Sequence, residues 1–175
     1  MADPAHTSAA SVLHRPLTDL PDPLPIPTIP TGRGHAPFFA RIRPPGSKSL
    51  TNRALLLAAL TSGQSRIHQP LLGADDSDRM LAALRQLGAR IDSEPNDTLL
   101  IHGVGGRWRP DLGQPPAGNE LRLDLNNAGT ATRFLAAAAA LSPIPIIIDG
   151  NERMRQRPIG ELAEALADLG LQVDY

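Results

Sequence analysis

Hydrophobic positions follow two different periods along the chain after residue 36. Apolar residues spaced three and four apart are typical of helices, whereas alternating or short β-branched runs are typical of strands. By the first pattern we expect helices at 47–60, 77–87, 127–141 and 158–169. By the second we expect strands at 38–43, 66–68, 89–92, 98–102, 121–125 and 144–148. The pattern therefore predicts an α/β protein in which single strands alternate with amphipathic helices.

The order of these elements repeats with a period of about 80 residues. Arg53 and Arg133 stand in corresponding helices, and Gly88 and Gly170 stand where the corresponding second helices should end. Gly63 is expected to close the first helix in the same way. Repeated packing units need neighbours to bury their apolar faces. We therefore expect two repeats, at about 45–118 and 119–175, with helices on one side of mixed parallel and antiparallel strands and with the second repeat incomplete.

Proline divides the chain unevenly, since ten of its 18 prolines precede residue 46. The run PDPLPIPTIP at 21–30 lacks the backbone N–H groups that a helix or a central strand needs. We expect residues 1–35 to be an extended, Pro-rich disordered arm. Residues 36–175 are expected to hold the folded part.

The composition excludes several classes of site and partner. The 17 Lys and Arg and 18 Asp and Glu give a formal net charge of −1, which indicates neither a nucleic acid nor an anionic membrane as partner. The absence of cysteine excludes disulfides, zinc–thiolate sites and a thiol nucleophile. No apolar run approaches the roughly 18 residues of a membrane span, and the N-terminal segment lacks an apolar secretion region. We expect a cytoplasmic protein whose site uses oxygen and nitrogen chemistry.

Two cations stand at the start of the helix expected from residue 47. A helix N-terminus carries about +0.5 of partial charge and favours anions, so Lys48 and Arg53 are unfavourable there unless an anion binds. The hydroxyls of Ser47 and Ser49 and the free backbone N–H groups could converge with Lys48 on a phosphate or carboxylate. The alternative is that Lys48 is a solvated surface lysine and Ser47 a simple cap.

The second repeat has a similar helix start. Gly129 allows close backbone approach, Thr130 can cap the helix or donate to an anion, and Arg133 is again a cation near a helix N-terminus. The recurrence favours a shared anionic ligand site over two solvated cations. A further basic segment, 153–157, precedes the last helix. Its spacing neither selects one of its three arginines nor excludes a solvated loop.

Other motifs do not reach the pattern that their chemistry needs. The chain has no nucleotide-binding P-loop, because the glycine before Lys48 is one residue too far away and Arg41 stands where the first glycine belongs. The acidic turn at 75–78 lacks the spacing of a calcium loop, and we expect Asp76 or Ser77 to cap the next helix. The five histidines have no metal-ligand spacing, so no metal site is expected.

Three longer motifs stand in a fixed order along residues 45–175. They read PGSKSLTNRALLLA at 45–58, NAGTATR at 127–133 and RMRQRPIG at 153–160. Together they resemble the 5-enolpyruvylshikimate-3-phosphate synthase (3-phosphoshikimate 1-carboxyvinyltransferase) family of the shikimate pathway. The resemblance implies transfer of the enolpyruvyl group from phosphoenolpyruvate to the 5-hydroxyl of shikimate 3-phosphate, with release of phosphate. It implies no metal and no organic cofactor.

The resemblance also implies roles for individual residues by matching position. Lys48 is the implied catalytic residue, contacting phosphoenolpyruvate and lying beside shikimate 3-phosphate. Ser49 and Arg53 would hold shikimate 3-phosphate together with Lys48. The implied phosphoenolpyruvate site consists of Lys48, Asn127, Gly129, Thr130 and Arg157. Both substrates are polyanions, which agrees with the anion sites inferred from the helix starts.

The chain departs from the family pattern in length and at one position. The family fold has two domains of three α/β units each with the active site between them, so the fold implied here is incomplete. An aspartate acid/base and other groups from the second domain have no counterpart. We expect the chain alone to bind substrate weakly and to turn over negligibly, with the remainder of the enzyme as a partner. Many family members have proline where this chain has Phe134.

Two other functions are left open by the residues. The related transferase that uses UDP-N-acetylglucosamine shares the fold and the donor, but Ser49 and the absence of cysteine argue against it. The other alternative is a non-catalytic, anion-binding remnant of the enzyme.

Overall fold

The structure is a computed structural model that describes Asp19 and residues 44–110 and 119–175. The chain divides into the units Met1–Arg43 and Pro44–Tyr175, and the account below concerns the second. The arm expected at 1–35 and the strand expected at 38–43 lie outside the described residues, apart from Asp19. The boundaries of the two repeats stay predictions.

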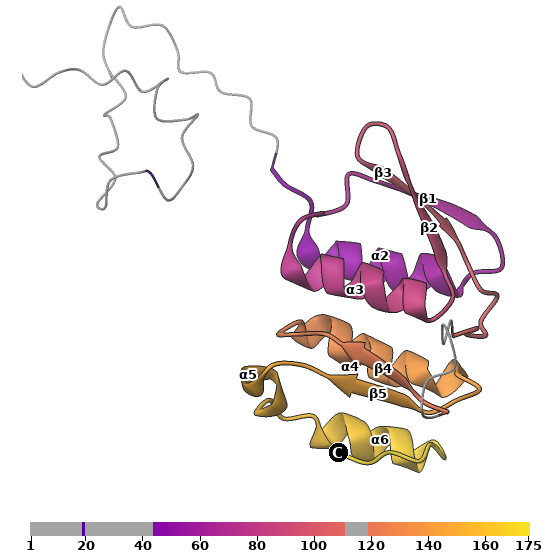
Figure 1. Cartoon of the computed structure of the whole chain (residues 1–175), viewed down its shortest axis with the longest axis vertical. Coiled ribbons are helices and arrows are strands. Elements are labelled where there is room, and N and C mark those ends of the chain that lie inside the picture. Colours follow the sequence, from indigo (N-terminus) through magenta and orange to yellow (C-terminus); the bar gives the residue numbers. More distant parts are fainter. Residues whose placement is uncertain (1–18, 20–43, 111–118) are drawn as a thin grey trace, which may run out of the picture. The chain divides into compact units, whose positions relative to one another are not determined.

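The helices and strands of Pro44–Tyr175 follow the predicted order (Figure 1). They are α2 (Lys48–Leu60), β1 (Gln64–His68), α3 (Asp75–Gln86), β2 (Arg90–Glu94), β3 (Thr98–His102), β4 (Leu121–Asp124), α4 (Gly129–Ala138), the 3-10 helix η2 (Ala139–Leu141), β5 (Ile146–Asp149), α5 (Glu152–Arg155) and α6 (Gly160–Asp168). Each of the four expected helices is present, and so is each expected strand that falls within the described ranges. None of the described helices is long and apolar enough to cross a membrane.

The strands form two small sheets of different type. In the first, the order is β1-β3-β2 and both pairs are antiparallel, with Ile67 opposite Leu99 and Ile91 opposite Ile101. In the second, β4 and β5 pair in parallel, and α4 makes the crossover between them. Helices α2 and α3 lie side by side against the first sheet (Figure 1). The predicted mixture of parallel and antiparallel strands with packed helices is confirmed.

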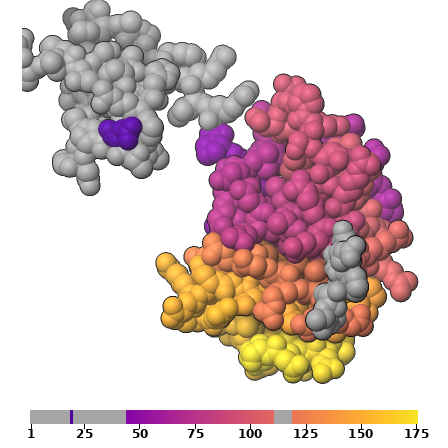
Figure 2. Space-filling model, in the orientation of Figure 1, coloured from indigo at the N-terminus to yellow at the C-terminus, as the bar shows by residue number. Residues whose placement is uncertain are grey.

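One hydrophobic core joins elements of both predicted repeats. Its members come from α2, α3, β2, β3, β4 and α4, and they include Leu55, Ala59, Met80, Leu84, Ile101, Leu123, Ala131 and Leu135. Full burial of each large apolar side chain contributes about 1.5–3 kcal/mol. Figure 2 shows that residues before the 111–118 segment pack directly against residues after it. The relative positions of α2, α3 and α4 are therefore set by apolar packing.

Trp108 connects the segment after β3 to this core. Its side chain is 1% exposed, and its Nε1–H donates a hydrogen bond of 2.7 Å to the backbone carbonyl of Ala138 at the end of α4. A buried indole needs such a partner, because an unpaired polar group in an apolar environment is costly.

The helix ends agree with the sequence at two of three glycines. Gly88 and Gly170 have left-handed φ values of +99° and +92°, which glycine adopts without steric cost. The expectation that Gly63 closes α2 is wrong. Thr61 caps α2 instead, because its backbone N–H and its side-chain hydroxyl both donate to the carbonyl of Ala58.

The expectation that Asp76 or Ser77 caps α3 is also wrong. The helix starts at Asp75, and Ala74 stands at the cap position without a side-chain hydrogen bond. Three aspartates occupy the first turn instead, where carboxylates interact favourably with the helix dipole. The Ser77 side chain points into the core, where its hydroxyl has no partner among the described residues.

The basic segment before α6 contains a short helix that sequence periodicity did not predict. Asn151 caps α5, since its Oδ1 accepts a hydrogen bond of 2.9 Å from the Met154 N–H. Met154 is 8% exposed and anchors the turn. Arg155 donates two hydrogen bonds of 2.9 Å to the Asp149 carboxylate. Four residues are too few to show a helical period, so tertiary contacts specify this turn.

Trp108→Phe tests the link between the segment after β3 and α4. The variant keeps an aromatic ring but leaves the Ala138 carbonyl unpaired, so we expect a loss of about 1–3 kcal/mol in the free energy of unfolding. Urea unfolding followed by circular dichroism measures the change. Leu169→Ala, at a side chain that is 78% exposed, is the control and should change stability by less than about 0.5 kcal/mol. Equal unfolding free energies for the two variants would contradict the assigned hydrogen bond.

Asp149 predicts a pH-dependent contribution to stability. Hydrogen bonds from Arg155 and from the Gly150 N–H, together with the charge of Arg122, lower the pKa of its carboxyl from 3.8 to about 2. Because the folded pKa lies below the unfolded one, the contribution is complete above about pH 4 and is lost as pH falls through 3.8 toward 2. Asp149→Asn should therefore be less stable than the wild type at pH 7, and this difference should shrink below pH 4.

The measurement is a series of thermal unfolding scans between pH 7 and pH 2. Glu164→Gln, at an exposed position in the middle of α6, is the matched control that removes one carboxylate without touching an ion pair of the described residues. A stability difference for Asp149→Asn that does not vary across this pH range would refute the assignment.

Candidate functional site

The start of α2 carries Lys48 in a half-exposed position. Ser47 is the helix cap, and its Oγ accepts a long hydrogen bond of 3.4 Å from the Leu50 N–H. The Lys48 ammonium lies 3.4 Å from a carboxylate oxygen of Asp76, which belongs to the first turn of α3, and its side chain is 48% exposed. Lys48 therefore has a carboxylate partner within the protein and still faces solvent.

Arg53 connects α2 to α4. Its guanidinium donates a hydrogen bond of 3.0 Å to the backbone carbonyl of Ser49, which confirms that these two residues share one side of the helix. The guanidinium carbon also lies 5.3 Å from the ring centroid of Phe134, within the range of a cation–π interaction. The residue that departs from the common family pattern thus contacts one of the predicted binding residues.

The start of α4 brings Gly129 and Arg157 together. A Cβ added to Gly129 would collide with the Arg157 guanidinium, so the absence of a side chain permits this approach. No side-chain cap is present at Ala128, which leaves N–H groups of the first turn available to a ligand. Within the part of the chain that the structure describes, no hydrogen bond or ion pair occupies the Arg157 guanidinium. A cation with no polar partner in residues 44–110 and 119–175 therefore lies against an uncapped helix start.

Asn127 and Thr130 flank this contact. The Asn127 side-chain oxygen is buried and lacks a hydrogen-bond partner among residues 44–110 and 119–175. The Thr130 hydroxyl likewise makes no hydrogen bond to the described residues. Four of the five residues predicted for phosphoenolpyruvate thus lie in one place with unused hydrogen-bonding capacity. Lys48, the fifth, forms an ion pair with Asp76, and among the described residues it has no hydrogen bond or ion pair to the other four.

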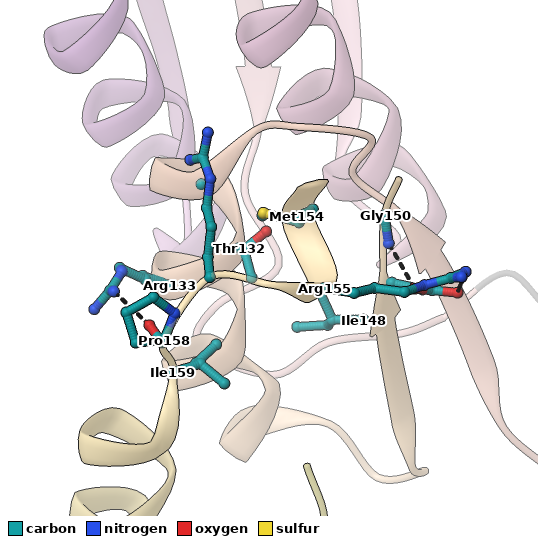
Figure 3. Close-up of a pocket in the computed structure, with 11 residues that line it drawn as sticks. Thr132, Arg133, Ile148, Gly150, Met154, Arg155, Pro158 and Ile159 are labelled. Carbon is teal, nitrogen blue, oxygen red and sulfur yellow. Dashed lines mark hydrogen bonds and ion pairs between the residues drawn. The ribbon is translucent and has the colours of Figure 1, made fainter. Parts of the chain in front are cut away.

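The other arginines near this place have protein partners or face solvent. Arg133 donates a hydrogen bond of 2.7 Å to the Pro158 carbonyl, and Arg155 is bound to Asp149 (Figure 3). Arg153 is exposed. A cavity of about 140 Å³ lies between Gly129, Gly150 and Arg157. The structure therefore distinguishes Arg157 from the other two arginines of the basic segment, which spacing could not do.

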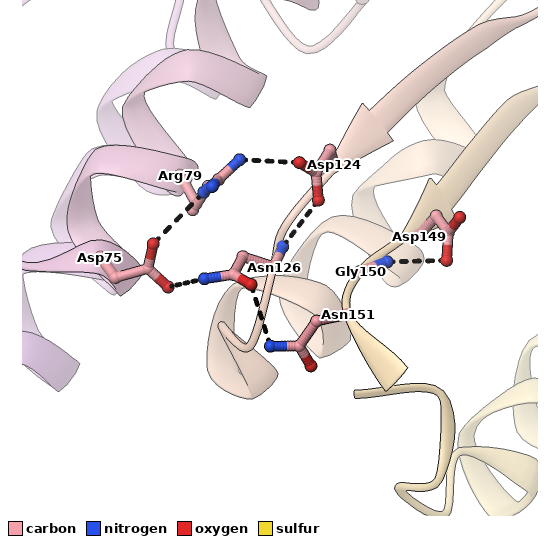
Figure 4. Close-up of polar contacts among 7 residues, drawn as sticks. All are labelled: Asp75, Arg79, Asp124, Asn126, Asp149, Gly150 and Asn151. Carbon is pink, nitrogen blue, oxygen red and sulfur yellow. Dashed lines mark hydrogen bonds and ion pairs between the residues drawn. The ribbon is translucent and has the colours of Figure 1, made fainter. Parts of the chain in front are cut away.

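A polar cluster beside the α4 start was not identified from the sequence. It consists of Asp75, Arg79, Asp124, Asn126 and Asn151 (Figure 4). Asp75, from the acidic turn, contacts both Arg79 and Asn126. The described residues contain no group of three or more His, Cys, Asp or Glu side chains arranged to hold a metal ion.

Comparison with protein families gives a match over most of the chain. A family model described as EPSP synthase (3-phosphoshikimate 1-carboxyvinyltransferase) matches residues 33–175. A 3-phosphoshikimate 1-carboxyvinyltransferase of Rhizobium leguminosarum bv. trifolii is 50% identical over 145 residues, and one of Rhizobium etli is 51% identical over 145 residues. Each alignment covers 83% of this chain and 31% of the relative. The chain thus spans about a third of the length of these curated relatives.

A longer, pentafunctional polypeptide matches more of this chain. The pentafunctional AROM polypeptide of Eremothecium gossypii is 43% identical over 178 residues, which cover 98% of this chain and 10% of that polypeptide. This match extends into the proline-rich segment, which the three motifs had left outside the resemblance.

Solved structures agree with the sequence matches. An EPSP synthase structure from Acinetobacter baumannii superposes with a TM-score of 0.64 at 27% identity, covering 74% of this chain and 27% of that one. A second structure from the same organism gives a TM-score of 0.62. The chain belongs to the EPSP synthase (3-phosphoshikimate 1-carboxyvinyltransferase) family.

Proposed function

We propose that this chain carries part of the active site for enolpyruvyl transfer from phosphoenolpyruvate to the 5-hydroxyl of shikimate 3-phosphate, with release of phosphate. The observation that carries the proposal is the Arg157 guanidinium, which lies against Gly129 at the start of α4 and has no hydrogen bond or ion pair among the described residues. We place the protein in the cytoplasm. Residues 1–35 are proposed to be an arm and 36–175 a partial transferase domain of two repeats.

The α4 start has the chemistry that phosphoenolpyruvate requires. This substrate carries a phosphate and a carboxylate, and a guanidinium can bind either group in bidentate fashion. Free N–H groups of the first helical turn favour the same anion, and the Asn127 amide and Thr130 hydroxyl add neutral hydrogen bonds. As charge redistributes toward the tetrahedral intermediate, fixed donors of this kind stabilise it without having to reorganise.

The start of α2 supplies the proposed shikimate 3-phosphate contacts. Ser49 and Arg53 lie on one side of the helix, and Arg53 is oriented by the Ser49 carbonyl and by the Phe134 ring. Lys48 stands between this group and the α3 start that carries Asp76. We propose Lys48 as the catalytic residue that contacts both substrates.

The isolated chain is proposed to bind weakly and to turn over negligibly. The aspartate acid/base of the family has no counterpart among the motifs matched here, so the remainder of the enzyme is the proposed partner. The family match favours shikimate 3-phosphate over UDP-N-acetylglucosamine as acceptor. A non-catalytic binding module is the alternative that the following experiment distinguishes.

Thermal unfolding of the chain with each ligand tests the proposal. Shikimate 3-phosphate at about ten times its dissociation constant should raise the unfolding free energy by about 1.4 kcal/mol, and UDP-N-acetylglucosamine should give no shift. Phosphoenolpyruvate added with shikimate 3-phosphate should raise it further. In Gly129→Ala the added methyl group displaces Arg157, so the phosphoenolpyruvate shift should disappear while the shikimate 3-phosphate shift is retained.

A second experiment mixes this chain with the polypeptide segment that follows the matched region in the Rhizobium etli relative, and measures turnover. If mixing the two polypeptides restores turnover, the result supports the proposed transferase activity. Ligand binding without turnover would instead indicate a binding module. Absence of a shift with both substrates would refute the proposed function.

Phe134→Leu tests the orientation of Arg53. The leucine side chain fills similar space but has no aromatic face, so we expect a two- to fivefold rise, roughly, in the dissociation constant for shikimate 3-phosphate. Phe134→Tyr keeps the ring and should remain near the wild-type value. Isothermal titration calorimetry measures both variants. Equal weakening by leucine and tyrosine would show that Arg53 does not depend on the ring.

A further inference from the structure

Asn126 stands at the junction of three segments and uses every polar group it has. Its backbone adopts a left-handed φ of +48°. Its N–H donates a hydrogen bond of 2.9 Å to the Asp124 carboxylate, and its carbonyl accepts one of 2.9 Å from the Asn151 N–H. The backbone is therefore held on both sides of the turn that leads from β4 to α4.

The Asn126 side chain connects α3 to the segment before α5 (Figure 4). Its Nδ2 donates a hydrogen bond of 2.9 Å to Asp75, and its Oδ1 accepts one of 2.9 Å from the Asn151 Nδ2. The orientation of the amide follows from chemistry, because an ionised carboxylate can only accept. The amide nitrogen must face Asp75, and the oxygen must then face Asn151.

Arg79 closes these contacts into a ring. Its Nε lies 3.3 Å from Asp75 and its terminal nitrogen 2.8 Å from Asp124, the same aspartate that accepts from the Asn126 N–H. The ring contains two carboxylates, those of Asp75 and Asp124, but only one guanidinium, that of Arg79. The neutral amide of Asn126 therefore supplies a further hydrogen-bond donor to Asp75.

Each segment in the ring leads directly to a proposed phosphoenolpyruvate contact. Asp75 precedes Asp76, the partner of Lys48. Asn126 precedes the 127–130 segment. Asn151 caps α5, after which the chain reaches Arg157. A Cβ at Gly150 would collide with the Asn126 carbonyl and with Met154, so this junction is tightly packed.

We propose that Asn126 is a positioning residue for phosphoenolpyruvate, whose amide fixes Arg157 relative to the first turn of α4. The inference rests on the proposed function and deepens it. Glycine would supply the left-handed backbone at lower steric cost, so what asparagine adds at this position is its amide. The ring is exposed, where hydrogen bonds contribute little to global stability. Its main consequence is local geometry.

Exchange of donor and acceptor tests the amide directly. Asn126→Asp places two carboxylates face to face and should open the ring. In the double variant Asp75→Asn with Asn126→Asp, the amide at position 75 donates to the carboxylate at position 126, so the hydrogen bond is restored in the opposite direction. The new carboxylate also accepts the hydrogen bond from Asn151. Asn126→Gly keeps the backbone conformation and removes the amide, which separates the two contributions.

Calorimetric titration of the chain, with phosphoenolpyruvate in the presence of shikimate 3-phosphate, is the readout. Asn126→Asp and Asn126→Gly should raise the dissociation constant for phosphoenolpyruvate about tenfold or more, because displacement of a contact by about 1 Å can cost about a hundredfold. The double variant should return most of the lost affinity. Shikimate 3-phosphate should lose less affinity than phosphoenolpyruvate in every variant, since among its proposed contacts only Lys48 is linked to the polar cluster, through Asp76 next to Asp75. Equal loss for both substrates, or no recovery in the double variant, would overturn the inference.

A readout without ligand separates this inference from the proposed function. The amide resonances of Gly129 and Thr130 and the Arg157 Nε resonance should shift in Asn126→Asp and return in the double variant. If the wild type binds neither substrate, the proposed function fails, yet these resonances still test the positioning. Resonances that do not move in Asn126→Asp would overturn the inference whether or not a ligand binds.

Discussion

The burial of one face of α4 against α2 and α3 is the constraint on which the candidate site depends. Ala131, Leu135 and Ala138 lie on that face and are at most 7% exposed. Because successive residues of a helix are rotated by about 100°, a slip of one residue would turn Phe134 away from Arg53 and Gly129 away from Arg157. Apolar packing specifies the rotation of α4, and this rotation aligns the polar contacts that α4 makes with α2 and with Arg157.

The helices and strands could be predicted from the sequence because most of them are long enough to show a repeated spacing of apolar residues. The ends at Gly88 and Gly170 followed as well, since left-handed closure is a local property of glycine. Gly63 and α5 show where local reasoning fails. At Gly63 a hydroxyl two residues earlier satisfies the terminal carbonyl first, and α5 depends on the Asn151 cap and on burial of Met154. The spacing of hydrophobic residues reveals neither the Thr61 hydrogen bond nor the contacts that form α5.

The candidate site was only partly predictable for a related reason. Asn127 to Thr130 are adjacent in sequence and Arg157 lies in a recognisable motif, so a resemblance could name them together. The contact between Asp75 and Asn126 joins residues 51 positions apart, and no spacing rule connects them. The same holds for Lys48 and Asp76, which meet because α2 and α3 pack side by side. The interpretation of Lys48 as a cation awaiting an anion omitted this internal carboxylate.

The internal partner nevertheless fits a binding site. The Lys48 ammonium lies 3.4 Å from the Asp76 carboxylate and its side chain is 48% exposed, so a doubly charged anion can compete for the lysine. Arg53 is held by a carbonyl and a ring, neither of which neutralises it. Arg157 has no polar partner among the described residues. The cations are therefore oriented by contacts that leave their charge available.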